Sequence, residues 1–145
     1  MKSVAERDTR QRRAIRAAFE RAGRPLSTDE VLAAAKHDSA GLGLATVYRS
    51  IRTLLEDGWL TAVDVPGKGA VYEIAGKEHH HHFSCTACLR VYELDGCVAT
   101  TRGRGSLSLL LPRGFRASGH EVTIYGSCAD CARASRPSAL SKTTA

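Results

Sequence analysis

Two Cys-x-x-Cys pairs constrain the fold of this 145-residue chain more than any other feature of its sequence. Cys85 and Cys88 form the first pair, and Cys128 and Cys131 form the second. Four thiolates are the ligand set of a closed tetrahedral zinc site, although a redox dithiol or an iron–sulfur cluster would use the same residues. We therefore expect structural zinc, with the segment 89–127 folded into a small unit that brings the two pairs together.

The fifth cysteine, Cys97, belongs to neither pair. A single free cysteine usually behaves as a small apolar side chain, and cysteine is among the most frequently buried residue types. We therefore expect Cys97 to pack in the protein interior rather than to bind metal.

Four consecutive histidines lie just before the first cysteine pair. Side chains alternate between the two faces of an extended strand, so His80 and His82 share one face while His79 and His81 share the other. We therefore expect two metal sites that draw on a single run of histidines. The alternative is an exposed histidine run that binds metal only incidentally.

Carboxylates and one distant histidine are available to complete these two sites. Glu73 and Glu93, on neighbouring predicted strands, are expected to join the first site as oxygen ligands. His120, just before the last predicted strand, is expected to join the second. A site of nitrogen and oxygen ligands releases metal more readily than four thiolates do, and exchange is what a metal sensor requires.

The N-terminal half predicts three helices, over about 9–22, 28–36 and 45–57. In the first, apolar residues recur with the period of one helix face. The second opens on a capping box, in which Ser27 and Glu30 satisfy each other's backbone N–H groups. A hydrophobic staple flanks this box and is expected to join Leu26 to Val31.

The third predicted helix has one apolar face and one polar face. Its buried stripe is expected to consist of Val47, Ile51, Leu54 and Leu55. Its opposite side is expected to carry Thr46, Tyr48, Arg49, Ser50, Arg52 and Thr53. A short helix that presents tyrosine, arginine and threonine outward can read base edges in the DNA major groove. The alternative is an exposed helix with no partner.

Two strands are predicted after the third helix, over 59–65 and 70–74, joined by a turn of proline, glycine and lysine. Three helices followed by a β-hairpin is the winged helix-turn-helix arrangement. We therefore predict a DNA-binding domain over residues 1–75 and a hinge over 76–78.

The segment 79–132 is predicted to be a small α/β domain. Its elements are expected to be two strands around the first cysteine pair, a short helix before Pro112, and one or two strands before the second pair, over 83–85, 91–94, 106–111 and 115–125. Residues 133–145 are expected to form a disordered tail. The expected fold class of the whole chain is α+β.

A formal net charge of +6 and a pI near 9.3 favour a polyanionic partner. Arginines crowd the first two dozen residues, at Arg7, Arg10, Arg12, Arg13, Arg16, Arg21 and Arg24. Such a cluster gains affinity for DNA phosphates through counterion release, whereas the alternative is a solvated helix face. No apolar run approaches the roughly 20 residues that span a bilayer, so we expect a cytoplasmic protein with no membrane partner.

These residues together resemble the ferric uptake regulator family of bacterial metal-sensing repressors. The motifs that carry the resemblance run from Gly43 to Arg49, from His79 to Cys88 and from His120 to Cys131, within residues 7–132. The resemblance implies a winged-helix DNA-binding domain, a small α/β dimerisation domain, and a homodimer on a palindromic operator in double-stranded DNA.

The resemblance also implies roles for individual residues. Structural zinc would be held by Cys85, Cys88, Cys128 and Cys131. An exchangeable sensing metal would be held by Glu73, His80, His82 and Glu93. A second site would be held by His79, His81 and His120. DNA would be contacted by Arg12, Tyr48 and Arg49, with Thr46 and Arg52 on the same recognition helix.

Three departures from the family pattern bear on the metal sites. Pro25 and Leu26 stand where the family often adds a histidine to the sensing site. Thr100 stands near the position of an acidic ligand of the second site, and the cysteine that the zinc-sensing branch commonly carries near Ile74 or Ala75 is missing. Histidine-rich ligands favour Zn²⁺ as the sensed metal, whereas the missing thiolate favours Fe²⁺ or Mn²⁺.

We therefore expect a metal-dependent transcriptional repressor of metal uptake genes, and not an enzyme. Metal at the hinge would fix the dimer so that both recognition helices meet successive major grooves. One alternative is a peroxide sensor of the same family, in which bound iron oxidises a histidine ligand. The other is a zinc hydrolase, which needs an open site with a water and a general base such as Glu73, Glu78 or Glu121.

Overall fold

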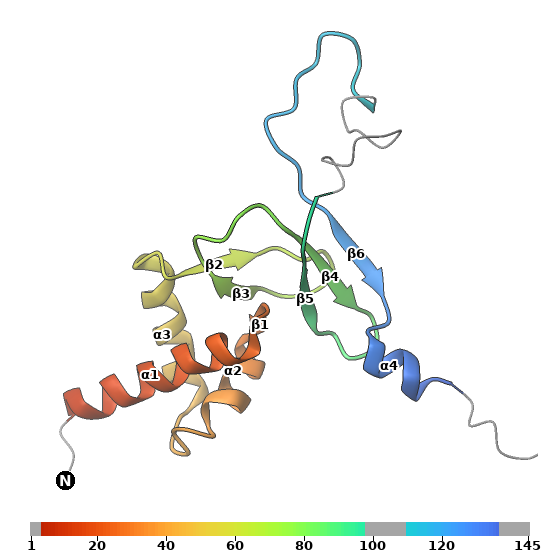
Figure 1. Ribbon diagram of the computed structural model, residues 1–145. Coiled ribbons are helices and arrows are strands. Elements are labelled where there is room, and N and C mark those ends of the chain that lie inside the picture. Colours follow the sequence, from red (N-terminus) through yellow and green to blue (C-terminus); the bar gives the residue numbers. More distant parts are fainter. Residues whose placement is uncertain (1–3, 98–109, 137–145) are drawn as a thin grey trace, which may run out of the picture.

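The computed structural model describes residues 4–97 and 110–136 of the chain. Figure 1 shows a helical part beside two small sheets, with a short helix near the C-terminus. The elements in chain order are α1 (Val4–Ala22), β1 (Leu26–Ser27), α2 (Thr28–Ala35), α3 (Leu44–Glu56), β2 (Leu60–Val63), β3 (Val71–Ile74), β4 (His81–Cys85), β5 (Val91–Leu94), β6 (Thr123–Gly126) and α4 (Ala129–Ala134). The described part therefore has the expected mixture of helices and strands. None of its helices is both long and apolar enough to span a membrane.

The helices α1, α2 and α3 pack around one apolar core. The face predicted for α1 is buried, since Ile15, Ala18 and Phe19 are each at most 1% exposed. Trp59, just after α3, meets the Phe19 ring edge-on, with 6.1 Å between the ring centroids. Fully buried residues from α2 and α3 complete the core, among them Val31, Val47 and Leu54. α1 begins at Val4, about five residues earlier than its apolar pattern predicts.

Side chains of the first turn fix the start of α2. Ser27 Oγ accepts the Glu30 N–H at 3.3 Å, and Glu30 Oε2 accepts the Ser27 N–H at 2.9 Å. The predicted capping box is thus confirmed. Leu26 and Val31, the two residues of the predicted staple, are both buried in the core. Burial would raise the pKa of Glu30, but the Ser27 N–H and the Arg24 guanidinium outweigh it and lower that pKa.

The helix α3 begins and ends one residue earlier than predicted. Val47, Ile51 and Leu54 are buried, as its apolar pattern predicts. Ser50 was expected to face outward and is instead only 7% exposed. It lies three residues after Val47 and four before Leu54, so the helical period puts it on the buried side. A small hydroxyl side chain is tolerated there, which polarity alone did not reveal.

The strands β2 and β3 form the predicted antiparallel hairpin. Leu60 lies opposite Ile74, and Val63 lies opposite Val71. Gly67 in the connecting turn has φ of +76°, a left-handed conformation that glycine adopts without steric cost. The two-residue strand β1 was not predicted; it pairs with β3 on the side away from β2 and gives the sheet order β1-β3-β2.

The second sheet has the strand order β5-β4-β6. β4 and β5 pair antiparallel around the first cysteine pair, as predicted, with Ser84 opposite Val91. β6 pairs parallel to β4, with Phe83 beside Ile124. Because β6 runs parallel to β4, the chain leaving β5 must return to the sheet at the end where β4 begins.

Apolar and cation–π contacts join the two sheets. A small valine cluster combines the hairpin and its loop with β5, and its members are Val63, Val65, Val71 and Val91. Arg24 crosses the same junction, with its guanidinium carbon 5.7 Å from the centroid of the Tyr92 ring. The helical part and the second sheet are therefore in direct contact.

The C-terminal elements differ in part from prediction. The helix expected over 106–111 falls largely outside the described residues. The tail expected to be disordered from residue 133 is still helical there, because α4 runs to Ala134. The Ser135 hydroxyl closes its last turn by donating to the Cys131 carbonyl at 2.8 Å. Residues 137–145 lie outside the described residues.

The capping box predicts a stability effect at a single side chain. Replacing Ser27 with alanine removes the acceptor for the Glu30 N–H, so we expect the free energy of unfolding to fall by about 1 kcal/mol. Ser27→Thr keeps the hydroxyl and should cost clearly less. Trp59, the single tryptophan, reports unfolding of this part through its fluorescence in a urea titration of zinc-saturated protein. Equal losses in both variants would contradict the capping role.

Candidate metal centres

Three groups of metal-ligating side chains lie in the described part of the chain. In each group the ligand atoms lie within 4.8 Å of one another. The first group consists of Cys85, Cys88, Cys128 and Cys131. The second consists of Glu73, His80 and His82. The third consists of His79, His81, Cys97 and His120.

The four cysteines meet where β4 and β6 end. The Cys85 side chain is fully buried, and the Cys128 backbone N–H donates to its sulfur at 3.3 Å. Cys88 Sγ and Cys128 Sγ are 3.8 Å apart. Tetrahedral zinc with Zn–S bonds of about 2.3 Å separates its sulfurs by roughly 3.8 Å. The geometry therefore matches a closed zinc site.

The four thiols differ in their tendency to ionise. The backbone N–H groups of Cys128 and Cys88 lower the pKa of the Cys85 thiol to about 6. A hydrogen bond to the Cys128 sulfur, together with burial, raises the pKa of Cys131 to about 12. Four crowded thiolates repel one another, so without a cation some of the sulfurs keep their protons at neutral pH. A divalent zinc ion supplies the charge that lets all four ionise, and the donor set fits it.

The second group lies between the two sheets. Glu73, on β3, is only 4% exposed. Its carboxylate oxygens lie 3.1 and 3.2 Å from His80 Nε2. One of them also lies 3.1 Å from His82 Nε2. A single buried carboxylate on the hairpin is thus held by one imidazole just before β4 and one on β4.

The hydrogen bonding of His80 prepares it to bind a cation. Its Nδ1 donates to the Glu78 carbonyl at 2.7 Å, so its Nε2 is left to face the Glu73 carboxylate. A bare nitrogen lone pair facing a carboxylate is repulsive, and either a proton or a metal ion relieves it. Burial would lower the pKa of His80, but the Glu78 carbonyl and the Glu73 carboxylate outweigh it and raise that pKa.

Glu93 was expected to complete this group and lies outside it. It is directly opposite His82 in the β4–β5 ladder. Its carboxylate pairs instead with the Lys77 ammonium, from the chain segment that joins the two sheets. Charge pairing with a nearby lysine therefore takes up the oxygen that the sequence assigned to metal.

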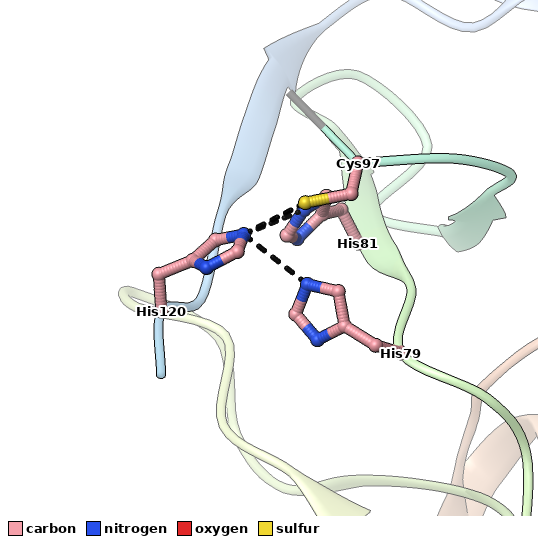
Figure 2. Close-up of side chains that lie close together, drawn as sticks. All are labelled: His79, His81, Cys97 and His120. Atoms are coloured by element: carbon pink, nitrogen blue, oxygen red, sulfur yellow. Dashed lines mark hydrogen bonds between the residues drawn. The ribbon is translucent and has the colours of Figure 1, made fainter. Parts of the chain in front are cut away.

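The third group contains the expected histidines and one residue that was not expected. Figure 2 shows Cys97 directed toward His120, beside His79 and His81. Cys97 Sγ lies 3.0 Å from His120 Nε2. The prediction that Cys97 packs as an apolar residue is therefore wrong, because its sulfur points at a cluster of imidazole nitrogens. The signal that was available is its position just beyond the strand that pairs with the histidine run.

Sheet topology explains why these side chains meet. His81 begins β4, and its partner across the antiparallel ladder is Leu94, the last residue of β5. Cys97 follows Leu94 by three residues, and His120 precedes β6 by three residues. The beginning of β4, the end of β5 and the beginning of β6 all lie at one edge of the sheet.

The residues expected to contact DNA lie mainly on the outer side of α3. Tyr48 is 56% exposed, and Arg49 and Arg52 are exposed beside it. Arg49 donates to Thr46 Oγ1 at 3.3 Å, and Arg52 pairs with Glu56 at 3.0 Å. Both contacts are at the surface, where such pairs contribute little to stability.

The arginines near the N-terminus differ in their exposure and contacts. Arg12 and Arg13 are exposed on α1. Arg16 instead packs over the Trp59 ring at 4.8 Å, and Arg21 pairs with Asp38 at 2.7 Å. Arg16 and Arg21 therefore have partners within the helical part of the protein.

Comparison with known proteins identifies the family. The model of the ferric uptake regulator family matches residues 4–125. The chain belongs to this family. It is 33% identical over 90 residues to the ferric uptake regulation protein of Campylobacter jejuni, covering 62% of this chain and 55% of that protein. It is 32% identical over 108 residues to that of Bordetella parapertussis, covering 74% and 76%. The chain thus spans little more than half the length of the Campylobacter relatives that it matches.

Solved structures of ferric uptake regulators have the same fold. The regulator of Francisella tularensis with iron has a TM-score of 0.61 and 25% identity, over 91% of this chain and 98% of that one. The Helicobacter pylori regulator, whose structure reveals three functional metal-binding sites, has a TM-score of 0.62 and 23% identity, over 84% and 79%. A zinc-bound manganese uptake regulator has a TM-score of 0.66 and 24% identity, over 88% and 99%.

The group of Cys85, Cys88, Cys128 and Cys131, called here the cysteine group, predicts a tightly held zinc ion. Cys88 is exposed, so replacing it with serine removes a sulfur ligand while disturbing little packing. We expect Cys88→Ser to lose about one zinc ion per chain and to unfold at a lower temperature, since a metal bound there would hold the ends of β4 and β6 together. Elemental analysis after dialysis and a thermal melt measure both effects.

The matched control is Thr86→Ser, two residues away, which keeps the hydroxyl that donates to the Gly126 carbonyl. It should retain the zinc content of the unmodified protein. If Cys88→Ser also retained it, the cysteine group would not be a zinc site.

Proposed function

We propose that this protein is a metal-dependent, DNA-binding transcriptional repressor of metal uptake or homeostasis genes. The observation that carries the proposal is the convergence of Glu73, His80 and His82 between the two sheets. One ion bound there is held both by the hairpin that follows α3 and by the sheet that carries the cysteine group. Membership of the ferric uptake regulator family supports the same role.

The proposed DNA-binding domain covers residues 1–75. In it, α2 and α3 form a helix-turn-helix, α3 is the recognition helix, and the β2–β3 hairpin is the wing. Residues 76–78 are the proposed hinge, and Gly76, with φ of +79°, gives this connection a sharp change of direction. Residues 79–132 are the proposed dimerisation domain. The exposed polar side of α3 supports this reading, because it leaves Tyr48 and Arg49 accessible to DNA.

Metal at the hinge is proposed to control DNA binding by fixing the angle between these domains. Glu73 moves with the wing, whereas His80 and His82 move with the dimerisation domain. A metal ion that binds all three favours a single relative orientation over the range available without it. A preference of ~100-fold for the DNA-competent orientation corresponds to about 2.7 kcal/mol of coupling free energy.

The ligands of the hinge site limit the choice of sensed metal. Two imidazoles and one carboxylate, with further positions open to water, are the donor set of many non-haem Fe²⁺ sites. Zn²⁺ accepts the same donors, and Mn²⁺ accepts them more weakly. We propose Fe²⁺ or Zn²⁺ as the regulatory ion. The solved Francisella regulator with iron is consistent with the first of these.

A homodimer on a palindromic operator is proposed as the active form. Two apolar side chains of β6 are exposed, with Ile124 at 46% and Tyr125 at 49%. β6 is also an edge strand of the sheet formed by the described residues. An edge strand that carries exposed apolar side chains is a place where a second copy of the chain can pair or pack.

Metal control is tested by DNA binding with and without metal at the hinge. We expect the double variant His80→Ala, His82→Ala to lose at least tenfold in affinity, because Glu73 alone cannot hold the ion. The target is a duplex selected from a random pool by the metal-loaded protein, and the readout is a gel shift. His37→Ala is the control, since His37 is exposed and lies in none of the three groups. Equal binding by all three proteins, or binding that a chelator leaves unchanged, would reject metal control.

The recognition helix is tested on the same duplex. Arg49→Ala removes an exposed guanidinium from the proposed DNA face, so we expect binding to weaken by about 1–3 kcal/mol. Arg133→Ala is the matched control, because Arg133 is also an exposed arginine and pairs with Asp130 on α4. Fluorescence anisotropy at two salt concentrations measures both. If the two variants bound the duplex equally well, α3 would not be the recognition helix.

Peroxide sensing is the second candidate function. The hinge group in the described residues offers three donor atoms, so an iron ion held there keeps positions at which peroxide can bind. Oxygen added to a histidine ligand would then release the metal. Iron-loaded protein can be treated with peroxide, and the peptide that contains the histidine run can then be analysed by mass spectrometry. This measurement decides between peroxide sensing and metal sensing. An unmodified peptide excludes this candidate and leaves metal sensing.

A further inference from the structure

We propose that Cys97 is the fourth ligand of a His₃Cys zinc site, with His79, His81 and His120. The thiolate supplies the anionic ligand for which the family resemblance implies an acidic residue near Thr100. The site would be a second thiolate-containing zinc centre, separate from the cysteine group and from the hinge. Its existence does not depend on whether the protein binds DNA.

The four donor atoms are spaced as ligands of one small ion. His120 Nε2 lies 3.0 Å from Cys97 Sγ, 3.1 Å from His79 Nε2 and 3.3 Å from His81 Nε2. Tetrahedral zinc, with bonds of about 2.0 Å to nitrogen and 2.3 Å to sulfur, separates such ligands by roughly 3.3–3.6 Å. A shift of a few tenths of an ångström would therefore seat the ion.

Hydrogen bonding alone does not account for this convergence. His120 Nε2 carries either one proton or one lone pair, so it can satisfy only one of its three close neighbours. The other nitrogens then face one another with like partial charges. A cation shared by all four atoms makes every contact favourable. Crowding of this kind is therefore the signature of a ligand set rather than of a hydrogen-bonded network.

The turn before Cys97 directs its sulfur toward the three histidines. Gly96 has φ of +90°, a conformation that residues with a side chain rarely adopt. This turn comes directly after β5 and brings the chain back over the edge where β4 and β6 begin. His81 is buried at that edge and His79 is exposed, so the cluster has a fixed inner wall and an outer side through which an ion can enter.

The sulfur determines which metal the site prefers. Thiolate is a soft ligand that favours Zn²⁺ over Fe²⁺ and Mn²⁺, whereas a carboxylate favours the harder ions. The hinge group has a carboxylate, Glu73, at the corresponding position in its ligand set. Two sites that draw on the same histidine run are thus expected to differ in selectivity, with zinc retained beside Cys97 and the exchangeable ion at the hinge.

Cadmium NMR can observe each site separately. In protein loaded with ¹¹³Cd, the resonance moves to higher frequency as sulfur ligands are added, so three classes of site are resolved. We expect one resonance from the four-sulfur site, one from a one-sulfur site and one from a site of nitrogen and oxygen ligands. Cys97→Ser should move only the second resonance into the nitrogen and oxygen range. It should also weaken zinc binding at that site at least tenfold in a chelator competition.

The conservative variant Cys97→Asp supplies an anionic oxygen ligand. It should recover zinc affinity relative to Cys97→Ser without restoring the one-sulfur resonance. A spectrum of Cys97→Ser identical to that of the unmodified protein would overturn the proposal. If the unmodified protein showed all three ¹¹³Cd resonances but did not bind DNA in a metal-dependent way, the result would count against the proposed function and not against this site.

A second measurement needs no variant and therefore does not depend on whether one folds. Iodoacetamide alkylates accessible thiolates, and peptide mapping identifies Cys97 in the unmodified protein. Mild chelation should expose Cys97 to alkylation, and one added equivalent of zinc should protect it at least tenfold. Equal alkylation of Cys97 with and without zinc would overturn the proposal.

Discussion

The contact of the buried Glu73 carboxylate with His80 and His82 is the interaction on which the arrangement of the helical part and the second sheet depends. At 4% exposure it has little water, and an unpaired charge in that position costs several kcal/mol. His80, just before β4, and His82, on β4, satisfy it at 3.1 Å. The cation that makes this contact favourable is either a proton on an imidazole or a metal ion between the groups. Loading the site would therefore change the forces between the two sheets without requiring a change in either fold.

The second sheet carries a metal group at each end, and strand direction is the reason. β4 begins at His81, within the histidine run, and ends at Cys85, while β6 runs parallel to it from near His120 to near Cys128. The sulfur content of the ligand sets falls from the cysteine group, through the group that contains Cys97, to the sulfur-free hinge. Because thiolate ligands hold zinc most firmly, this order predicts a permanent ion at one end, a selective ion at the other, and an exchangeable ion between the sheets.

Local patterns in the sequence were sufficient for much of this picture. The capping box at Ser27, the apolar stripe of α3 and the alternation of the histidines each depend on neighbouring residues, and each appears in the structure as predicted. The errors concern contacts between distant segments. The pairing of Glu93 with Lys77 and the approach of Cys97 to His120 depend on sheet register and on a glycine turn. Once β4 and β5 are recognised as a hairpin, their register brings Cys97 to the histidines, but sequence spacing alone does not.

The central claim is that occupancy of the hinge by metal and binding of DNA are coupled. Thermodynamic linkage makes this coupling reciprocal, so DNA must raise the affinity of the hinge for metal by the same factor that metal raises the affinity for DNA. The most direct measurement is a metal titration of protein whose two sulfur-containing sites are already filled with zinc, with and without a saturating operator duplex. The account predicts tighter metal binding in the presence of DNA, and no such increase in Glu73→Gln. A metal affinity that DNA leaves unchanged in the unmodified protein would contradict it.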